Sequence, residues 1–94
     1  MRACPIDLIY PTSKFKHSFS KLPSKIQKLA IKKDKIFRKN AFDPRLRTHK
    51  LKGKLKKYWS YRVDEKYRIV FEFVEKEIVL YQDIGTHEIY RWKV

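Results

Sequence analysis

Three stretches in the C-terminal half decide the fold: residues 57–63 (KYWSYRV), 67–74 (YRIVFEFV) and 77–84 (EIVLYQDI). In the first two, large apolar residues occupy every second position, which is typical of strands with one buried face. The links between the three stretches, of three and two residues, are short enough for hairpins. The sequence therefore predicts three consecutive antiparallel strands, and we expect Trp59 and Tyr61 in the core.

Upstream of these strands, the period of the apolar residues changes. Residues 6–10 (IDLIY) predict a short strand closed by Pro11. Thr12 or Ser13 is a suitable N-cap for a short helix, in which three apolar residues recur at helical spacing: Phe15, Phe19 and Leu22. The N-terminal part therefore predicts a strand followed by a helix.

A second helix is predicted over about residues 24–39, with Pro23 ending the first helix and suited to the first position of the second. Asn40 and the turn-forming residues 41–44 follow it. One face is rich in lysine, and the other carries an apolar stripe formed by Ile26, Leu29, Ala30 and either Ile36 or Phe37. The expected fold is α+β: two N-terminal helices packed on a small, mainly antiparallel sheet, in a single domain spanning residues 1–94.

The charge of the chain is the first indication of function. It has 24 Lys and Arg against 10 Asp and Glu, a net charge of +14 on 94 residues. Such a field attracts polyanions, so nucleic acid, an acidic protein and an anionic membrane surface are all possible partners. The lone Cys4 excludes an internal disulfide, and no apolar run approaches the roughly 20 residues of a membrane span. The N-terminus lacks a secretory signal, so we expect a cytoplasmic protein.

Several familiar catalytic patterns are absent from the sequence. It has no glycine-rich phosphate loop, no paired-cysteine zinc pattern and no closely spaced carboxylates for magnesium. An enzyme of this type that acts on phosphodiesters is therefore expected to need no metal and no other cofactor. Metal-free cleavage uses a proton acceptor for the ribose 2′-hydroxyl, a proton donor for the leaving oxygen, and cations for the phosphorane. DNA lacks that internal nucleophile, so the sequence favours RNA.

Polar residues gather in a basic segment at 49–54 and in a second segment at 85–90, with Arg62 and Arg68 on the strands between them. A guanidinium beside apolar strand residues is costly unless it faces a groove or an anion. The first segment begins a patch that we predict to bind RNA: Lys50, Lys52, Lys54, Lys56 and Lys57.

Two segments together, HKLKGKLKKYWSYRVDEKYRIVF (49–71) and DIGTHEIY (83–90), resemble the RelE/ParE superfamily of type II toxin–antitoxin systems. The similarity is greatest to the YafQ and YoeB branches of messenger-RNA interferases. It implies two helices on an antiparallel sheet, and metal-independent cleavage of translated messenger RNA on the ribosome by 2′-hydroxyl attack. It also implies silencing by an acidic antitoxin protein encoded beside the toxin.

The resemblance assigns roles to individual residues. His49 and His87 match functional histidines of YafQ-like members, Arg68 matches a phosphate ligand, and Tyr90 matches the aromatic residue that closes the motif. Arg62 stands where relatives have Lys or His, so it supplies charge but cannot abstract a proton. Lys66 falls near an Asp that YafQ-like enzymes use, which leaves the identity of the general base open.

Other interpretations remain for the residues and for the chain. Arg68 can instead form a structural ion pair with Glu72 or Glu88, and Tyr90 can be a packed, half-buried ring. His17, on the first helix, is expected at the surface. For the whole protein, the alternatives are a ParE-like toxin that inhibits DNA gyrase by protein binding, and an RNA- or ribosome-binding domain without chemistry.

Overall fold

The computed structural model describes residues 3–93. Two α-helices pack on a five-stranded mixed sheet in which the strand order is β1-β5-β4-β3-β2. The elements, in chain order, are β1 (Leu8–Pro11), α1 (Ser13–Ser20), α2 (Ser24–Lys39), the 3-10 helix η1 (Pro44–Leu46), β2 (His49–Lys50), the 3-10 helix η2 (Gly53–Leu55), β3 (Trp59–Arg62), β4 (Arg68–Glu75), β5 (Ile78–Gly85) and the 3-10 helix η3 (His87–Lys93). The predicted α+β fold is confirmed.

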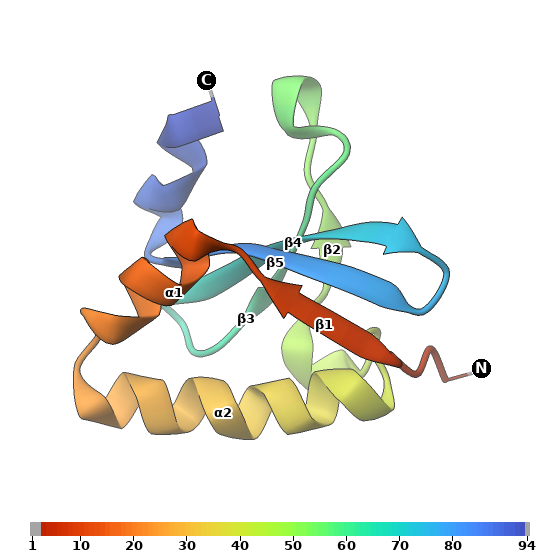
Figure 1. The fold of residues 1–94 in the computed structure, drawn as a ribbon, viewed down its shortest axis with the longest axis horizontal. Helices are drawn as coiled ribbons and strands as arrows, with labels where there is room; N and C mark the ends of the chain where they lie inside the picture. Colours follow the sequence, from red (N-terminus) through yellow and green to blue (C-terminus); the bar gives the residue numbers. More distant parts are fainter. Residues whose placement is uncertain (1–2, 94) are drawn as a thin grey trace.

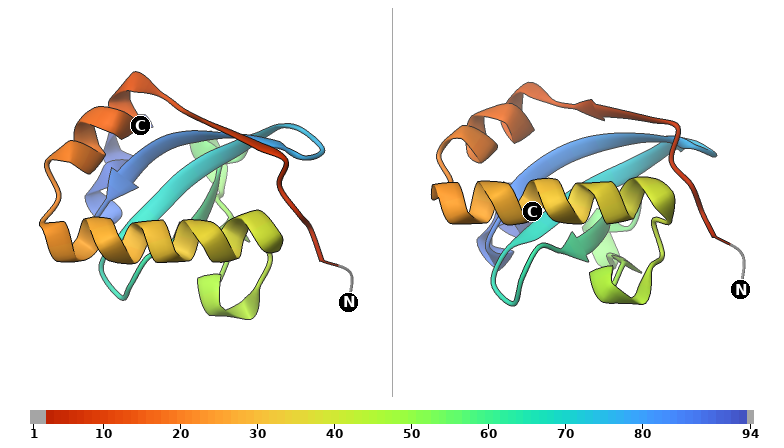
Figure 2. Two further views of the ribbon diagram at one scale, coloured as in Figure 1. Left: turned by 60° about the horizontal axis from the view of Figure 1, so that its bottom comes forward. Right: turned by 90° about the horizontal axis from the view of Figure 1, so that it is seen from below.

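The two faces of the sheet are covered differently. Figure 1 shows α2 below the sheet, with η3 and the loop that carries η2 rising on the other side. The views in Figure 2 show that α2 crosses one face of the sheet along its whole length. The face turned away from α2 is therefore framed by η2 and η3, which contact each other.

The core lies between α2 and the sheet. Phe37 is fully buried, and its ring centroid lies 4.7 Å from that of Tyr61 and 4.8 Å from that of Phe71. These contacts decide between the two candidates for the end of the apolar stripe, because Ile36 is only half-buried. Tyr61 is buried as predicted, whereas Trp59 is half-buried and packs at the margin of the core. Aromatic pairs at such separations add to the burial of apolar area.

The helix boundaries follow from local chemistry. Thr12, not Ser13, is the N-cap of α1, and its Oγ1 accepts a hydrogen bond from the backbone N–H of Phe15 at 3.0 Å. The range predicted for α2 is confirmed at 24–39. Pro23 is its N-cap rather than its first residue, so that prediction was wrong by one position. A proline fits there because the first N–H groups of a helix have no intrahelical acceptor.

The sheet has two features that the sequence patterns do not reveal. The first strand runs from Leu8 to Pro11 rather than over 6–10, and it pairs in parallel with β5, with Ile9 opposite Val79. It lies at an edge of the sheet, where Pro11 is tolerated. The second is β2, only two residues long, in which His49 lies opposite Ser60 of β3. The three antiparallel strands predicted downstream are confirmed as β3, β4 and β5.

Candidate functional site

Two arginines lie directly opposite each other on the face of the sheet turned away from α2. Arg62 of β3 pairs in register with Arg68 of β4, and both side chains are half-buried. Within residues 3–90 neither forms an ion pair with a carboxylate. Like charges directly opposite each other destabilise a sheet. The pair therefore forms a cationic site suited to an anion.

The β3–β4 turn holds Arg68 in place. Asp64 Oδ1 accepts hydrogen bonds from the backbone N–H groups of Lys66 at 2.9 Å and Tyr67 at 2.7 Å. Arg68 Nη1 donates to the backbone oxygen of Asp64 at 2.6 Å and to that of Tyr67 at 3.2 Å. These bonds occupy one guanidinium nitrogen and leave the positive charge without a carboxylate. The alternative ion pairs of Arg68 with Glu72 or Glu88 do not form in the structure.

The start of η3 lies close against the end of the sheet. Gly85, the last residue of β5, lies opposite Arg68 in the sheet register. A Cβ at this position would lie 2.5 Å from Cγ2 of Ile89, which is closer than real Cβ contacts allow. Glycine therefore permits η3 to turn back at this distance and carry exposed His87 beside the arginine pair.

A hollow of about 410 Å³ joins the β3–β4 turn to the start of η3. Arg68 and His87 both line it, which confirms that the sheet and η3 bring these two residues to one place. Its other lining residues are Glu65, Lys66, Thr86 and Glu88. The sequence analysis gave no role to Glu65, Thr86 or Glu88, although Thr86 and Glu88 flank His87.

Tyr90 is fixed from below by a buried serine. The hydroxyls of Tyr90 and Ser60 lie 3.0 Å apart and share a hydrogen bond. Ser60 is fully buried, and the ring of Tyr90 is half-buried. Sequence reasoning missed Ser60, although a hydroxyl among the aromatic residues of the first strand was a usable signal. The bond ties η3 to the centre of the sheet.

His49 lies at the far edge of the same face. It stands opposite Ser60, and directly paired residues point to the same side of a sheet. Its exposed ring places Nδ1 3.1 Å from the backbone oxygen of Arg47. A carbonyl oxygen only accepts, so Nδ1 carries the hydrogen in this bond and Nε2 is the free nitrogen. Strands β2 and β5, from which the chain leads to His49 and His87, are three strand spacings apart, roughly 14 Å.

The predicted basic patch borders this face. The five lysines are exposed and surround η2, whose first residue, Gly53, has φ of 64°. This left-handed conformation favours glycine, because a side chain would be strained there. Since η2 contacts η3, the loop brings positive charge next to the segment that carries His87 and Tyr90: Lys50, Lys52, Lys54, Lys56 and Lys57.

The structure was also searched for metal sites and membrane-spanning helices. Among the described residues, no three His, Cys, Asp or Glu side chains form a group that could hold a metal ion. The described helices include none with the length and apolar character needed to cross a bilayer.

Comparison with known proteins gives both family and structural matches. Residues 13–85 match a family model described as the RelE-like toxin of the type II toxin–antitoxin system HigB. The toxin–antitoxin complex RelBE2 from Mycobacterium tuberculosis superposes with a TM-score of 0.74 at 16% identity, covering 92% of this chain and 95% of that chain. For the YoeB/ParE toxin from Agrobacterium tumefaciens, the values are 0.72, 14%, 86% and 99%.

A third solved structure, YafQ from E. coli, has a TM-score of 0.66 at 13% identity and covers 90% of this chain and 97% of that one. At such identities the structural likeness establishes the fold, and the family model carries the assignment. No curated protein sequence matches the chain.

Proposed function

This chain belongs to the HigB-like family of RelE-like toxins from type II toxin–antitoxin systems, and from that premise we propose that it is an endoribonuclease that cleaves messenger RNA on the ribosome. The observation that carries the proposal is the pair Arg62 and Arg68, which has no carboxylate partner and lies beside His87. A phosphodiester is the anion that such a pair fits, because guanidinium groups bind phosphate through two hydrogen bonds at once.

The proposed reaction uses the substrate's own nucleophile. A proton leaves the ribose 2′-hydroxyl, the 2′-oxygen attacks the adjacent phosphorus, and the P–O5′ bond breaks. The departing 5′-oxygen takes up a proton, so the products end in a 2′,3′-cyclic phosphate and a 5′-hydroxyl. Arg62 and Arg68 stabilise the additional negative charge of the five-coordinate phosphorus.

We assign proton exchange with one of these oxygens to His87. Its imidazole lines the same hollow as Arg68, and histidine is the side chain most often used for this task near neutral pH. Tyr90 offers a ring for stacking on a base, with its hydroxyl held by Ser60. The distance between the supporting strands favours RNA contact, rather than the second proton transfer, as the role of His49.

The partners follow from the charge and from the family. The exposed lysines around η2 are suited to the phosphates of messenger and ribosomal RNA. An antitoxin that silences the protein is expected to be acidic, because the toxin carries a net charge of +14.

The proposal is tested in a reconstituted translation reaction with a defined message. Addition of the purified protein should halt translation and cut the message, and mass spectrometry should find 2′,3′-cyclic phosphate at the new 3′ ends. His87→Ala should abolish most cleavage, whereas His17→Ala should not, because His17 is exposed on α1. An intact message would contradict the proposal, and arrest of a gyrase supercoiling reaction instead would favour the ParE-like activity.

A further inference from the structure

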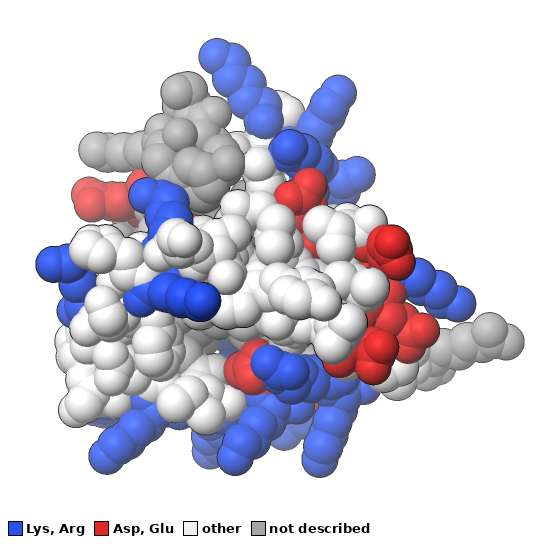
Figure 3. Space-filling view, in the orientation of Figure 1, with Lys and Arg blue, Asp and Glu red and all other residues white. Residues whose placement is uncertain are grey.

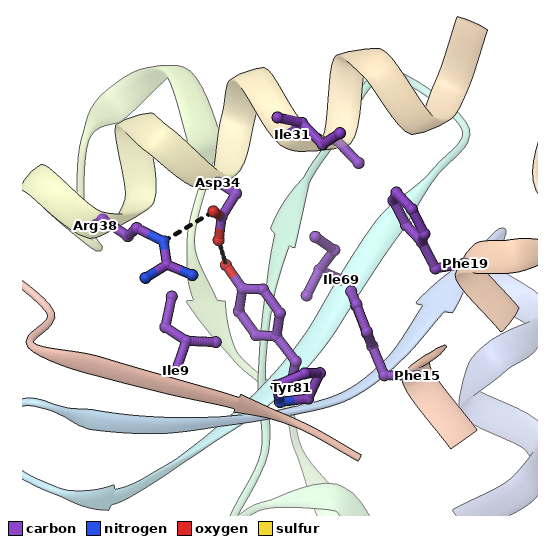
Figure 4. A pocket seen from close by; sticks show the side chains of 10 residues that line it. Ile9, Phe15, Phe19, Ile31, Asp34, Arg38, Ile69 and Tyr81 are labelled. Carbon is purple, nitrogen blue, oxygen red and sulfur yellow. Dashed lines mark hydrogen bonds and ion pairs between the residues drawn. The ribbon is translucent and has the colours of Figure 1, made fainter. Parts of the chain in front are cut away.

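A second concave site lies on the other side of the sheet, among β1, α1 and α2. Its volume is about 200 Å³. Figure 4 shows Phe15 and Phe19 reaching into it from α1, with Ile31 on the α2 side and Ile69 and Tyr81 at the sheet. We call this site the helix-side pocket.

The polar groups of the helix-side pocket are already paired with each other. The hydroxyl of Tyr81 donates to Asp34 Oδ1 at 2.7 Å, and Arg38 Nε donates to Asp34 Oδ2 at 2.8 Å (Figure 4). The Tyr81 hydroxyl also lies 2.8 Å from that of Tyr61, and burial raises the pKa of both tyrosines. They therefore stay neutral, and both oxygens of Asp34 are occupied. An occupant is recognised by its apolar shape.

The volume of the pocket limits what enters it. Small-molecule sites usually enclose about 300–1,000 Å³, so a pocket of about 200 Å³ is better suited to a single large apolar side chain. The apolar surface continues beyond the pocket onto β1, where Leu8 is 43% exposed and Tyr10 52% exposed. Exposed apolar patches of this kind mark protein interaction surfaces.

Positive charges surround this apolar surface. Ile31, at the rim of the pocket, is 51% exposed, and Lys28 and Lys35 are its neighbours one turn away on the surface of α2. Figure 3 shows a broad uncharged area over β1 and α1, bordered by a row of Lys and Arg side chains along α2. The surface therefore complements a segment that combines an apolar residue with acidic neighbours.

We propose that the helix-side pocket docks an acidic segment of a partner protein, which inserts one large apolar side chain between α1 and α2. Carboxylates that flank this anchor pair with Lys28 and Lys35. The identification of the partner as the antitoxin rests on the proposed function, whereas the chemistry of the docked segment rests on the pocket alone.

Docking at this site leaves the arginine pair open. Ile69 follows Arg68 directly along β4, so the two side chains point to opposite faces of the sheet. A partner anchored in the helix-side pocket must therefore continue around an edge of the sheet to cover the candidate nuclease site. The inference separates an anchoring surface from a blocking surface.

Synthetic peptides provide the test. Three 14-residue peptides are titrated into the ¹⁵N-labelled protein: one rich in Glu with a central Trp, the same peptide with Ala for Trp, and a Lys-rich peptide with the Trp. The first should shift amide signals of Phe15, Phe19 and Ile31, and the other two should bind at least ten-fold more weakly. No binding of the first peptide at 1 mM, or shifts confined to the η2 lysines, would overturn the proposal.

Matched variants locate the contact. Ile31→Glu should weaken binding of the Glu-rich Trp peptide at least ten-fold, whereas Val74→Glu should change it less than two-fold, since Val74 is similarly exposed (47%) but does not line the pocket. The double change Lys28→Glu with Lys35→Glu should weaken it more than the double change Lys50→Glu with Lys52→Glu. Equal effects within either pair would refute docking here. Messenger-RNA cleavage by Ile31→Glu is measured in parallel, so failure of the docking proposal is distinguished from failure of the nuclease proposal.

Discussion

Replacing Gly85 with alanine is expected to displace η3 and to slow cleavage, although the new side chain is a single methyl group. The added Cβ would lie 2.5 Å from Cγ2 of Ile89, about 1 Å short of ordinary van der Waals contact. Isoleucine is branched at Cβ and restricted in χ1, so its methyl group does not simply rotate away. Moving η3 by about 1 Å is the remaining way to relieve the contact.

The size of the effect is the balance of two terms. Overpacking a fitted contact costs about 1–3 kcal/mol. Gly85 does not have a positive φ, so alanine suits the backbone there and returns about 0.4–1 kcal/mol by restricting the unfolded chain. We therefore expect a net loss of about 1–2 kcal/mol in the free energy of unfolding. Since misplacement of reacting groups by about 1 Å can cost 10²-fold in rate, cleavage should fall by about that factor.

Urea denaturation and single-turnover cleavage measure the two effects, and Ile89→Ala supplies the control. In the double variant with Gly85→Ala and Ile89→Ala the clash is absent, so the two changes should be coupled by about 1 kcal/mol or more in a double-mutant cycle. A Gly85→Ala protein as stable and as active as the wild type, or additive effects of the two changes, would refute the argument that this contact positions η3.

Four further predictions follow from the site and its surroundings. His87→Ala should lower the single-turnover cleavage rate by about 10²–10⁴-fold with RNA affinity unchanged, whereas the exposed His17→Ala should have no effect. Arg68→Ala should lower both rate and affinity, because the ground-state phosphate is already an anion, and Arg45→Ala is the matched control; a filter-binding assay in which Arg68→Ala binds RNA normally would count against a phosphate contact. Replacing Lys50, Lys52 and Lys54 by Ala should reduce the slope of log K against log salt by up to about three phosphate contacts, more than the same change at three exposed lysines of α2, Lys25, Lys32 and Lys39. The pKa of Asp43, held at about 2 by its hydrogen bonds with Arg45, should rise toward its ordinary value in Arg45→Ala when followed by NMR; because the folded-state pKa is depressed, the stabilisation that this pair provides is present above about pH 4 and disappears as the pH falls toward 2.

The predicted strands and helices were confirmed where local patterns were long enough to be specific. The sixteen residues of α2 carry several turns of apolar stripe, and the alternation in β3 and β4 is sustained. The two-residue β2 shows no period at all, and the parallel pairing of β1 with β5 joins segments about seventy residues apart in the sequence. Such pairings depend on tertiary packing, which the local pattern does not contain.

The site was predicted in its charges and motifs but not in its supports. Arg62, Arg68 and the histidines stand out by residue type, so the sequence indicated them directly. The bond of Tyr90 to buried Ser60 depends on how η3 folds back over the sheet, and so does the contact of Gly85 with Ile89. No local pattern encodes those distances.

One substitution in the substrate tests the central claim most directly. A message with 2′-deoxyribose at the single nucleotide 5′ of the scissile phosphate is translated with and without the protein, beside the all-ribose message. If the 2′-oxygen is the nucleophile, cleavage at that bond stops while cleavage elsewhere and binding to the ribosome continue. Undiminished cleavage at the deoxy position would contradict the mechanism proposed for Arg62, Arg68 and His87.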